Sequence, residues 1–410
     1  MQSGPAIAQK KASSHASTPP SPQGGSGPIQ RYRQGIRPAD RIRSQQEERS
    51  IMSIARKLAG IAGAVVAAFG LGAAQAQTDA GFPAPTGDQS IVPAGAKVEK
   101  LFEADCFSEG PSVGPDNSVY FSDITFTKFC KDAAGKPMGG HIWRYDPKTG
   151  KAAIFRSPSG MSNGTKFDRD GNMIIATGAD FGLRALLRID MATGRSTILA
   201  GMYEGKPFNA LNDISIDEQG RIYFTDPRYL GHEPVQADGF AAYRVDPDGK
   251  VTRVATDCGK CNGILVSPDQ KRVYIVSNDN GFLALENLKQ GEKSLPGPHM
   301  LQVWDLAADG TLSNRRVFKD YSKDRTPACS GPDGLIADAE GNLYVAERCE
   351  HRPGIAVYNP DGKELAFIST GKEMPTNVAF GRGELGNVLY ITSGKSLYRV
   401  KLGKKGYQLP

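Results

Sequence analysis

A short apolar strand pattern recurs six times along this chain, and this repeat constrains the fold more than any other feature of the sequence. Each copy is five residues long and centres on an aromatic or aliphatic side chain. The copies read VYFSD (119–123), MIIAT (173–177), IYFTD (222–226), VYIVS (273–277), LYVAE (343–347) and LYITS (389–393). Neighbouring centres lie 46 to 70 residues apart. Repeats of ~40–50 residues are typical of β-propellers, in which each repeat forms one blade.

A second strand follows each copy and runs into a tight turn, as in IWRYDPKTG at 142–150 and LLRIDMATG at 186–194. Together with the strands on either side, the two patterns predict four strands in each repeat. We therefore expect an all-β, six-bladed β-propeller of four-stranded blades over residues 97–410. The sixth repeat is one strand short, and VEKLF at 98–102 stands alone before the first repeat. We expect this N-terminal strand to complete blade six and close the ring, which removes an open sheet edge.

The residues before the repeats have the pattern of an exported protein. Arg56-Lys57 precede an apolar run at 58–72, and an Ala-x-Ala motif follows at 74–76. This order predicts a secretory signal peptide at 52–76, and hence a periplasmic or secreted protein. The apolar run is shorter than the ~20 residues that a membrane-spanning helix needs. We therefore expect no membrane attachment after cleavage.

The charge of the chain is concentrated in the leader. Residues 1–51 are rich in Ser, Pro, Gln and Gly, a composition that predicts disorder. Alternatively, they are a misassigned leader, because Met52 stands where a signal peptide ordinarily begins. Residues 77–96 are expected to form a linker. The formal net charge is +6, and ten basic but only three acidic residues lie at or before Lys57. The rest of the chain is close to neutral, which argues against nucleic-acid binding.

Six cysteines lie in the part that is expected to be exported, and an even number in an oxidising compartment favours disulfides. The CxxC motif at 258–261 has the spacing of redox proteins, but it lacks the βαβ context of such a motif. A zinc knuckle would need a second CxxC or paired His residues. We therefore expect three structural disulfides, with the pairing left open, among Cys106, Cys130, Cys258, Cys261, Cys329 and Cys349.

A polar residue lies eleven to thirteen positions before each strand centre, where the innermost strand of a blade is expected to begin. Four of the six precede Gly. The six ring residues are Glu109, Asn163, Asn212, Asn262, Asp333 and Asn377. If the repeats are equivalent, all six side chains converge at one mouth of the central channel. Asn, Asp and Gly are also common in turns, so any one position alone has a local explanation.

The two carboxylates of the ring predict a cation. Glu109 and Asp333 would repel each other at one mouth unless a cation lies between them. Carboxylate and amide oxygens suit a hard ion, so we expect one divalent cation, Ca²⁺ first. Zn²⁺, Mn²⁺ and Mg²⁺ are alternatives, although Zn²⁺ normally takes His or Cys ligands. His141 and His232 lie outside the ring; they belong either to loops over the mouth or to the ordinary surface.

Several motifs together resemble the family of gluconolactonase, regucalcin (senescence marker protein) and LRE six-bladed propellers. These motifs are EGP at 109–111, YEGKPFNALNDISID at 203–217, TDP at 225–227, CNGI at 261–264, SPD at 267–269 and GPDG at 331–334. The resemblance implies a metal held by Glu109, Asn262 and Asp333. It also implies Asn212 as a further ligand or a substrate contact, and Asn163 as a substrate-binding residue.

The resemblance implies a metal-dependent hydrolase that opens a sugar lactone or a similar cyclic ester. One accessible cation can polarise the substrate carbonyl and position a water. Asp333 is the expected catalytic base, because it is a carboxylate beside the point of attack. The chain departs from the family where Ala210-Leu211 precede Asn212, since many lactonases have Arg or Ser-Pro there. Long segments at 126–140 and 280–300 predict extra loops over the mouth.

Other functions are compatible with the same propeller, because a fold alone does not determine function. A phosphotriesterase-like hydrolase would use the same ring on a different ester. A non-catalytic propeller would bind a ligand without turnover, and a strictosidine synthase-like propeller would lack this metal set. If the protein is a lactone hydrolase, its expected partner is a small-molecule lactone or ester substrate.

Overall fold

The computed structural model describes residues 78–125, 130–132, 134–136, 138–229, 231–279, 297–322 and 329–409. All of them belong to one compact unit, which spans residues 69–410. The predicted leader and signal peptide, residues 1–76, lie outside the described residues, so both stay predictions. Within the described part, no helix is both long enough and apolar enough to cross a membrane.

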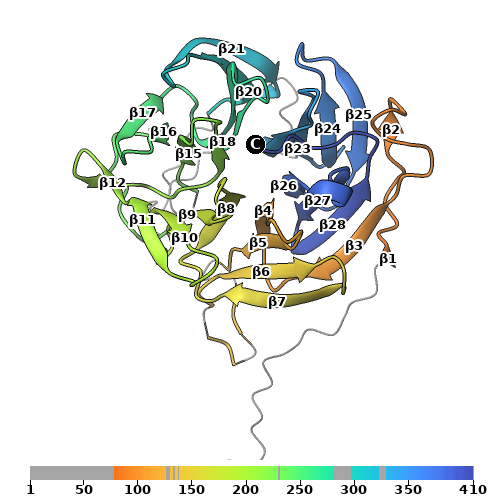
Figure 1. Ribbon diagram of the computed structural model, residues 1–410, viewed down its shortest axis with the longest axis horizontal. Helices are drawn as coiled ribbons and strands as arrows, with labels where there is room; N and C mark the ends of the chain where they lie inside the picture. The colour runs from red at the N-terminus through yellow and green to blue at the C-terminus, as the bar shows by residue number, and fades with distance from the viewer. Residues whose placement is uncertain are drawn as a thin grey trace, which may run out of the picture. The chain divides into compact units, whose positions relative to one another are not determined.

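Six antiparallel sheets form a ring around a central channel, which confirms the predicted six-bladed propeller (Figure 1). The innermost strands are β4 (Ser108–Val113), β8 (Ser162–Phe167), β14 (Ile214–Ile216), β18 (Cys261–Val266), β22 (Cys329–Ala337) and β26 (Pro375–Phe380). The second strands are β5 (Val119–Asp123), β9 (Met173–Thr177), β15 (Ile222–Asp226), β19 (Arg272–Asn278), β23 (Leu343–Cys349) and β27 (Val388–Ser393). The third strands are β6 (His141–Asp146), β10 (Leu186–Ile189), β16 (Ala241–Val245), β20 (His299–Leu306), β24 (Gly354–Tyr358) and β28 (Ser396–Lys401). The outermost strands are β7 (Lys151–Arg156), β11 (Ser196–Ala200), β17 (Val251–Ala255), β21 (Leu312–Asp320), β25 (Glu364–Ser369) and β3 (Val98–Glu103).

The two ends of the propeller meet in blade six, as the strand count predicts. β3 pairs antiparallel with β28, and Phe102 lies opposite Leu397. The residues expected to form a linker add two edge strands, because β1 (Thr78–Asp79) pairs with β3 and β2 (Thr86–Gly87) pairs with β25. N-terminal and C-terminal segments therefore share one sheet, which closes the ring.

The repeated apolar pattern forms the second strand of each blade because this strand is covered on both faces. Neighbouring blades pack against each side of it, and β5, β9 and β15 are buried at every position. Full burial of a Val, Leu, Ile or Phe side chain stabilises the fold by about 1.5–3 kcal/mol. The six strand centres are at most 4% exposed: Tyr120, Ile174, Tyr223, Tyr274, Tyr344 and Tyr390.

Disulfides are present, as the cysteine count predicts. One joins Cys106 to Cys130, and another joins Cys258 to Cys261 within the CxxC motif. Cys349 is also disulfide-bonded. The register of β22 and β23 places the Cα of Cys349 opposite that of Cys329. These bonds agree with an oxidising compartment.

The C-terminal segment crosses one end of the central channel, where Figure 1 marks the chain end inside the ring. The backbone N–H of Tyr407 donates to the carbonyl of Ala337 at the end of β22, and Gln408 Nε2 donates to the carbonyl of Gly381 just after β26. This segment therefore covers the end of the channel at which the innermost strands finish. The ring residues lie at the other end, where these strands begin.

Candidate active site

Five of the six ring residues lie near the beginning of their innermost strands, and Asp333 is the fifth of the nine residues of β22. All but Asn212 are within β4, β8, β18, β22 and β26, and Asn212 lies two residues before β14. Glu109, Asn262 and Asp333 are 4%, 5% and 2% exposed. Neighbouring inner strands contact one another around the channel. The fold therefore brings the ring residues to one mouth.

Close packing between blades explains why Gly follows several ring residues. A Cβ on Gly110 would lie 2.1 Å from the carbonyl oxygen of Asn163. A Cβ on Gly334 would lie 2.0 Å from Asn377 Cγ. Protein interiors do not accommodate such overlap unless the neighbouring backbone, at Gly110, or the buried Asn377 side chain, at Gly334, moves. The close approach of adjacent inner strands therefore explains Gly334, whereas Gly110 is favoured both by this close approach and by its φ of +48°.

Two buried carboxylates from different blades interact at this mouth. Burial raises the pKa of Glu109 well above its usual range, and the negative charge of Asp333 raises it further. Burial also raises the pKa of Asp333, whereas the charge of Arg348 lowers it. Glu109 Oε2 accepts a hydrogen bond of 2.9 Å from the Gly110 N–H. Positive charge near both carboxylates stabilises their ionised forms.

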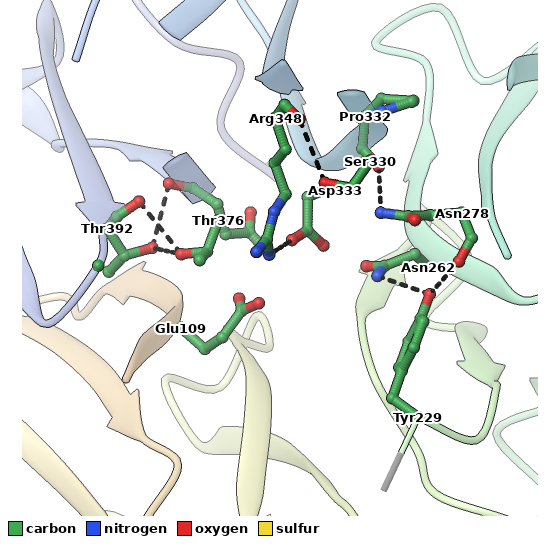
Figure 2. A network of polar contacts seen from close by, with 12 residues as sticks. Glu109, Tyr229, Asn262, Asn278, Ser330, Pro332, Asp333, Arg348, Thr376 and Thr392 are labelled. Carbon is green, nitrogen blue, oxygen red and sulfur yellow. Dashed lines mark hydrogen bonds and ion pairs between the residues drawn. The ribbon is translucent and has the colours of Figure 1, made fainter. Parts of the chain in front are cut away.

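Arg348 is the main site residue that the sequence interpretation missed, since the predicted ring contains no basic side chain. Its Nη1 lies 2.6 Å from Asp333 Oδ2, and Figure 2 shows the guanidinium between Asp333 and Glu109. Its Cζ also lies 5.8 Å from the centre of the Phe107 ring. Arg348 comes from β23, one residue beyond the repeated LYVAE pattern, so no sequence signal placed it in the channel.

Asn262 is oriented by a tyrosine that the sequence interpretation also missed. The Asn262 Nδ2 donates to Tyr229 Oη over 3.0 Å, and Tyr229 Oη donates to the carbonyl of Asn278 over 2.9 Å (Figure 2). The Asn262 side chain also interacts with the Asp333 carboxylate and lowers its pKa. Because its amide nitrogen serves these partners, its Oδ1 is the atom that can face a ligand. Tyr229 follows the TDP motif by two residues, and nothing in the local sequence indicated this contact.

A third buried carboxylate, that of Asp213, accepts a hydrogen bond across the channel axis. Asn377 Nδ2 donates to Asp213 Oδ2 over 3.3 Å, which joins blade six to blade three on the opposite side of the ring. Burial raises the pKa of Asp213, and the charge of Lys166 lowers it. The sequence interpretation chose Asn212 from the Asn-Asp pair and missed its neighbour. Asn377 is therefore engaged by Asp213 from the opposite blade.

The two histidines singled out from the sequence contact residues other than the six ring residues. His141 Nδ1 is 2.7 Å from Ser157 Oγ, and His232 Nε2 is 2.8 Å from Asp180 Oδ1. Both histidines therefore have local partners, Ser157 for His141 and Asp180 for His232. Most of the predicted cover over the mouth, residues 126–129 and 280–296, lies outside the described residues and stays a prediction.

A family model described as SMP-30/Gluconolactonase/LRE-like region matches residues 107–395 of this chain. The chain belongs to this family. The match confirms the resemblance that the motifs indicate, and it covers every one of the six ring residues.

Members of the SMP-30/gluconolactonase/LRE-like family are similar to this chain over most of its length. A gluconolactonase of Zymomonas mobilis is 27% identical over 76% of this chain and 83% of its own length. A pentonolactonase of Haloferax volcanii is 26% identical over 72% of this chain and 85% of its own length. The solved structure of a gluconolactonase from Xanthomonas campestris has a TM-score of 0.64 at 23% identity, covering 80% of this chain and 98% of that one. At 23% identity, the similarity to this solved structure shows a shared fold.

The ring of this SMP-30/gluconolactonase/LRE-like protein has donors that suit one hard cation. Among the described residues, no three His, Cys, Asp or Glu side chains form a metal-binding cluster, so carboxylates alone do not build a site. A cation held by Glu109 and Asp333 would need amide oxygens as co-ligands, and Asn262 is the ring amide that interacts with Asp333. Asn163 Oδ1 is buried and has no hydrogen-bond partner in the described part of the chain. A buried oxygen without a donor is a ready ligand for a cation or a substrate hydroxyl.

Proposed function

We propose that this protein hydrolyses a lactone at one divalent cation held by Glu109, Asn262 and Asp333, with Asn212 as a further ligand or substrate contact. The observation that carries the proposal is the pair of buried, mutually repelling carboxylates beside an oriented amide at one channel mouth. The similarity to a gluconolactonase over most of the chain supports a lactone as the substrate. Export to the periplasm or the medium is part of the proposal, and the disulfides support it.

Ca²⁺ is the proposed cation, because it takes carboxylate and amide oxygens as ligands. Mg²⁺ and Mn²⁺ accept the same donors, and Zn²⁺ is less suited to them because it prefers His and Cys. When bound, the cation supplies a Lewis acid for the lactone carbonyl. The carboxylates of Glu109 and Asp333 balance its charge.

Asp333 is proposed as the general base that accepts the proton of the attacking water. Burial raises the pKa of this carboxyl, which makes its carboxylate a stronger base than an exposed one. Arg348 contacts Oδ2 and opposes the rise of this pKa. The other oxygen, Oδ1, is then the atom that can accept a proton. Asn163 and Asn212 are proposed to orient the lactone through hydrogen bonds.

A substrate panel with controlled metal content tests the proposal. Sugar lactones, aliphatic lactones and phosphotriesters are assayed in EDTA and after addition of Ca²⁺, Mg²⁺, Mn²⁺ or Zn²⁺. We expect lactone hydrolysis that EDTA abolishes and Ca²⁺ restores. Hydrolysis that is indifferent to chelator would refute the metal dependence. Ligand binding without turnover of any compound would instead identify a non-catalytic propeller.

A variant of Asp333 and a control variant test whether Asp333 is the general base. Asp333→Asn is expected to keep the fold and to lower kcat by about 10²–10⁴. Glu340→Gln is a matched control, since Glu340 is 61% exposed in a turn at the covered end of the channel. This control should retain wild-type kcat. Full activity of Asp333→Asn would remove Asp333 as the base.

A further inference from the structure

The disulfide-bonded cysteines lie beside the candidate metal ligands. Cys106 is three residues before Glu109, and Cys261 directly precedes Asn262. Cys349 directly follows Arg348. All six cysteines of the chain belong to blades one, four and five, which are the blades that carry Glu109, Asn262 and Asp333.

Blade one shows how the chain holds the segment that leads into a ligand-bearing strand. The carboxylate of Asp123, at the end of β5, accepts hydrogen bonds of 2.8–3.0 Å from the backbone N–H groups of residues 105–107. We call this arrangement the carboxylate clasp. Blade three has the same clasp without a disulfide, because Asp226 accepts hydrogen bonds from the N–H groups of Asn209 and Ala210. A clasp therefore suffices to anchor such a segment.

Blade four has a different residue at the position of the clasp. In blade one, Asp123 pairs with Ser108, the residue before Glu109. In blade four, Ser277 pairs with Cys261, the residue before Asn262. The Ser277 hydroxyl donates to the carbonyl of Pro298, which lies outside the segment 258–260. A serine cannot accept several backbone N–H groups as a carboxylate can, and the Cys258–Cys261 disulfide lies where the clasp would act.

The loop closed by this disulfide also supports the partner of Asn262. Cys258 and Cys261 are fully buried, and Lys260 between them is 1% exposed. The Lys260 ammonium lies 5.1 Å from the centre of the Tyr229 ring, and Tyr229 in turn accepts the hydrogen bond from Asn262. The disulfide loop therefore contacts Asn262 both along the chain and through Tyr229.

We propose that the Cys258–Cys261 disulfide is a positioning element that holds Asn262 at the channel mouth, in place of the carboxylate clasp of blade one. This inference rests on the proposed function for its effect on cation binding. Its effect on the backbone of residues 258–263 is independent of that function. Groups that orient a metal ligand typically contribute 10–100-fold to metal affinity.

The test compares two double variants. Cys258→Ala with Cys261→Ala is expected to weaken Ca²⁺ binding in calorimetry by about tenfold or more. It is also expected to speed hydrogen exchange at the amides of Asn262 and Gly263. Cys106→Ala with Cys130→Ala is the matched control, because Asp123 still clasps residues 105–107. The control is expected to retain Ca²⁺ affinity and slow exchange at residues 107–110.

Two outcomes would overturn the positioning role: wild-type exchange at Asn262 and Gly263 in the blade-four variant, or equal losses of affinity in both variants. If the double variant does not fold, Cys258→Ala alone removes the bond and keeps the Cys261 side chain beside Asn262, and the same two measurements apply to it. If the wild-type protein binds no cation, the proposed function fails. The exchange measurement then still decides whether the disulfide positions Asn262.

Discussion

Arg348→Met is expected to destabilise the protein at neutral pH, because it leaves the buried Asp333 carboxylate without its counter-ion. The two side chains are 2.6 Å apart and are 23% and 3% exposed. Removal of one partner of a buried ion pair costs about 3–5 kcal/mol, and the partial exposure of Arg348 favours the lower end. Unfolding entropy for the roughly 300 residues that the structure describes is about 0.6 kcal/mol per kelvin, so a loss of about 3 kcal/mol lowers Tm by about 5 °C.

Thermal unfolding in EDTA measures this effect without interference from bound cations. Arg316→Met is the matched control, because it removes an ion pair with Asp305 whose side chains are 47% and 43% exposed. Exposed pairs contribute little to stability, so the Tm of this control should stay within about 1 °C of wild type. Equal Tm values for Arg348→Met and the wild-type protein at neutral pH would refute the counter-ion role of Arg348.

The pH dependence of the same variant checks the sign of the effect. Burial raises the pKa of Asp333 and Arg348 opposes the shift, so the folded pKa rises further when Arg348 is removed. A carboxyl with a raised folded pKa binds more protons in the folded than in the unfolded state. Stability then falls as pH rises from the unfolded pKa of about 3.9 towards the folded pKa. The Tm difference from wild type should therefore be small near pH ~4 and should widen towards neutral pH.

Three further variants test other parts of the site. Glu109→Gln is expected to raise Tm in EDTA, because burial and a nearby carboxylate raise the pKa of Glu109. The same variant is expected to lose the rise in Tm that Ca²⁺ causes in the wild-type protein. If Ca²⁺ still raised its Tm, Glu109 would be excluded as a ligand. Gly334→Ala should lower the unfolding free energy in urea by about 1–3 kcal/mol, since its Cβ would lie 2.0 Å from Asn377 Cγ; an unchanged value would contradict the close packing of blades five and six. Tyr229→Phe removes the hydrogen bond to Asn262 and should weaken Ca²⁺ binding about tenfold in calorimetry, with an unchanged circular dichroism spectrum; wild-type affinity would show that Tyr229 does not orient Asn262.

The propeller was predictable because each blade repeats a local pattern. Strand centres such as Tyr223 and Tyr344 are fully buried in the structure, and the sequence marks them by apolar residues at a fixed place in each repeat. The closing strand was predictable for a related reason, since residues 98–102 had no partner in the first repeat. The same positions are apolar in every repeat because each blade packs between two similar blades.

The candidate site was predictable only in part. Glu109, Asn262 and Asp333 could be chosen as candidates because they share one position among the six repeats, and a repeated backbone brings equal positions to one channel mouth. Arg348 and Tyr229 were missed because no other blade has an equivalent residue at these places. Their contacts depend on side-chain direction and on a loop path, which have no counterpart in the periodic pattern.

The sequence by itself determined the number of blades, the manner of ring closure and the six ring positions, because these depend on spacing along the chain. Only the tertiary structure decided that Arg348 neutralises Asp333, that Tyr229 orients Asn262 and that Asp213 meets Asn377 across the channel axis. The physical reason is that these contacts join residues from different strands or from opposite blades, and such distances are set by packing around the channel.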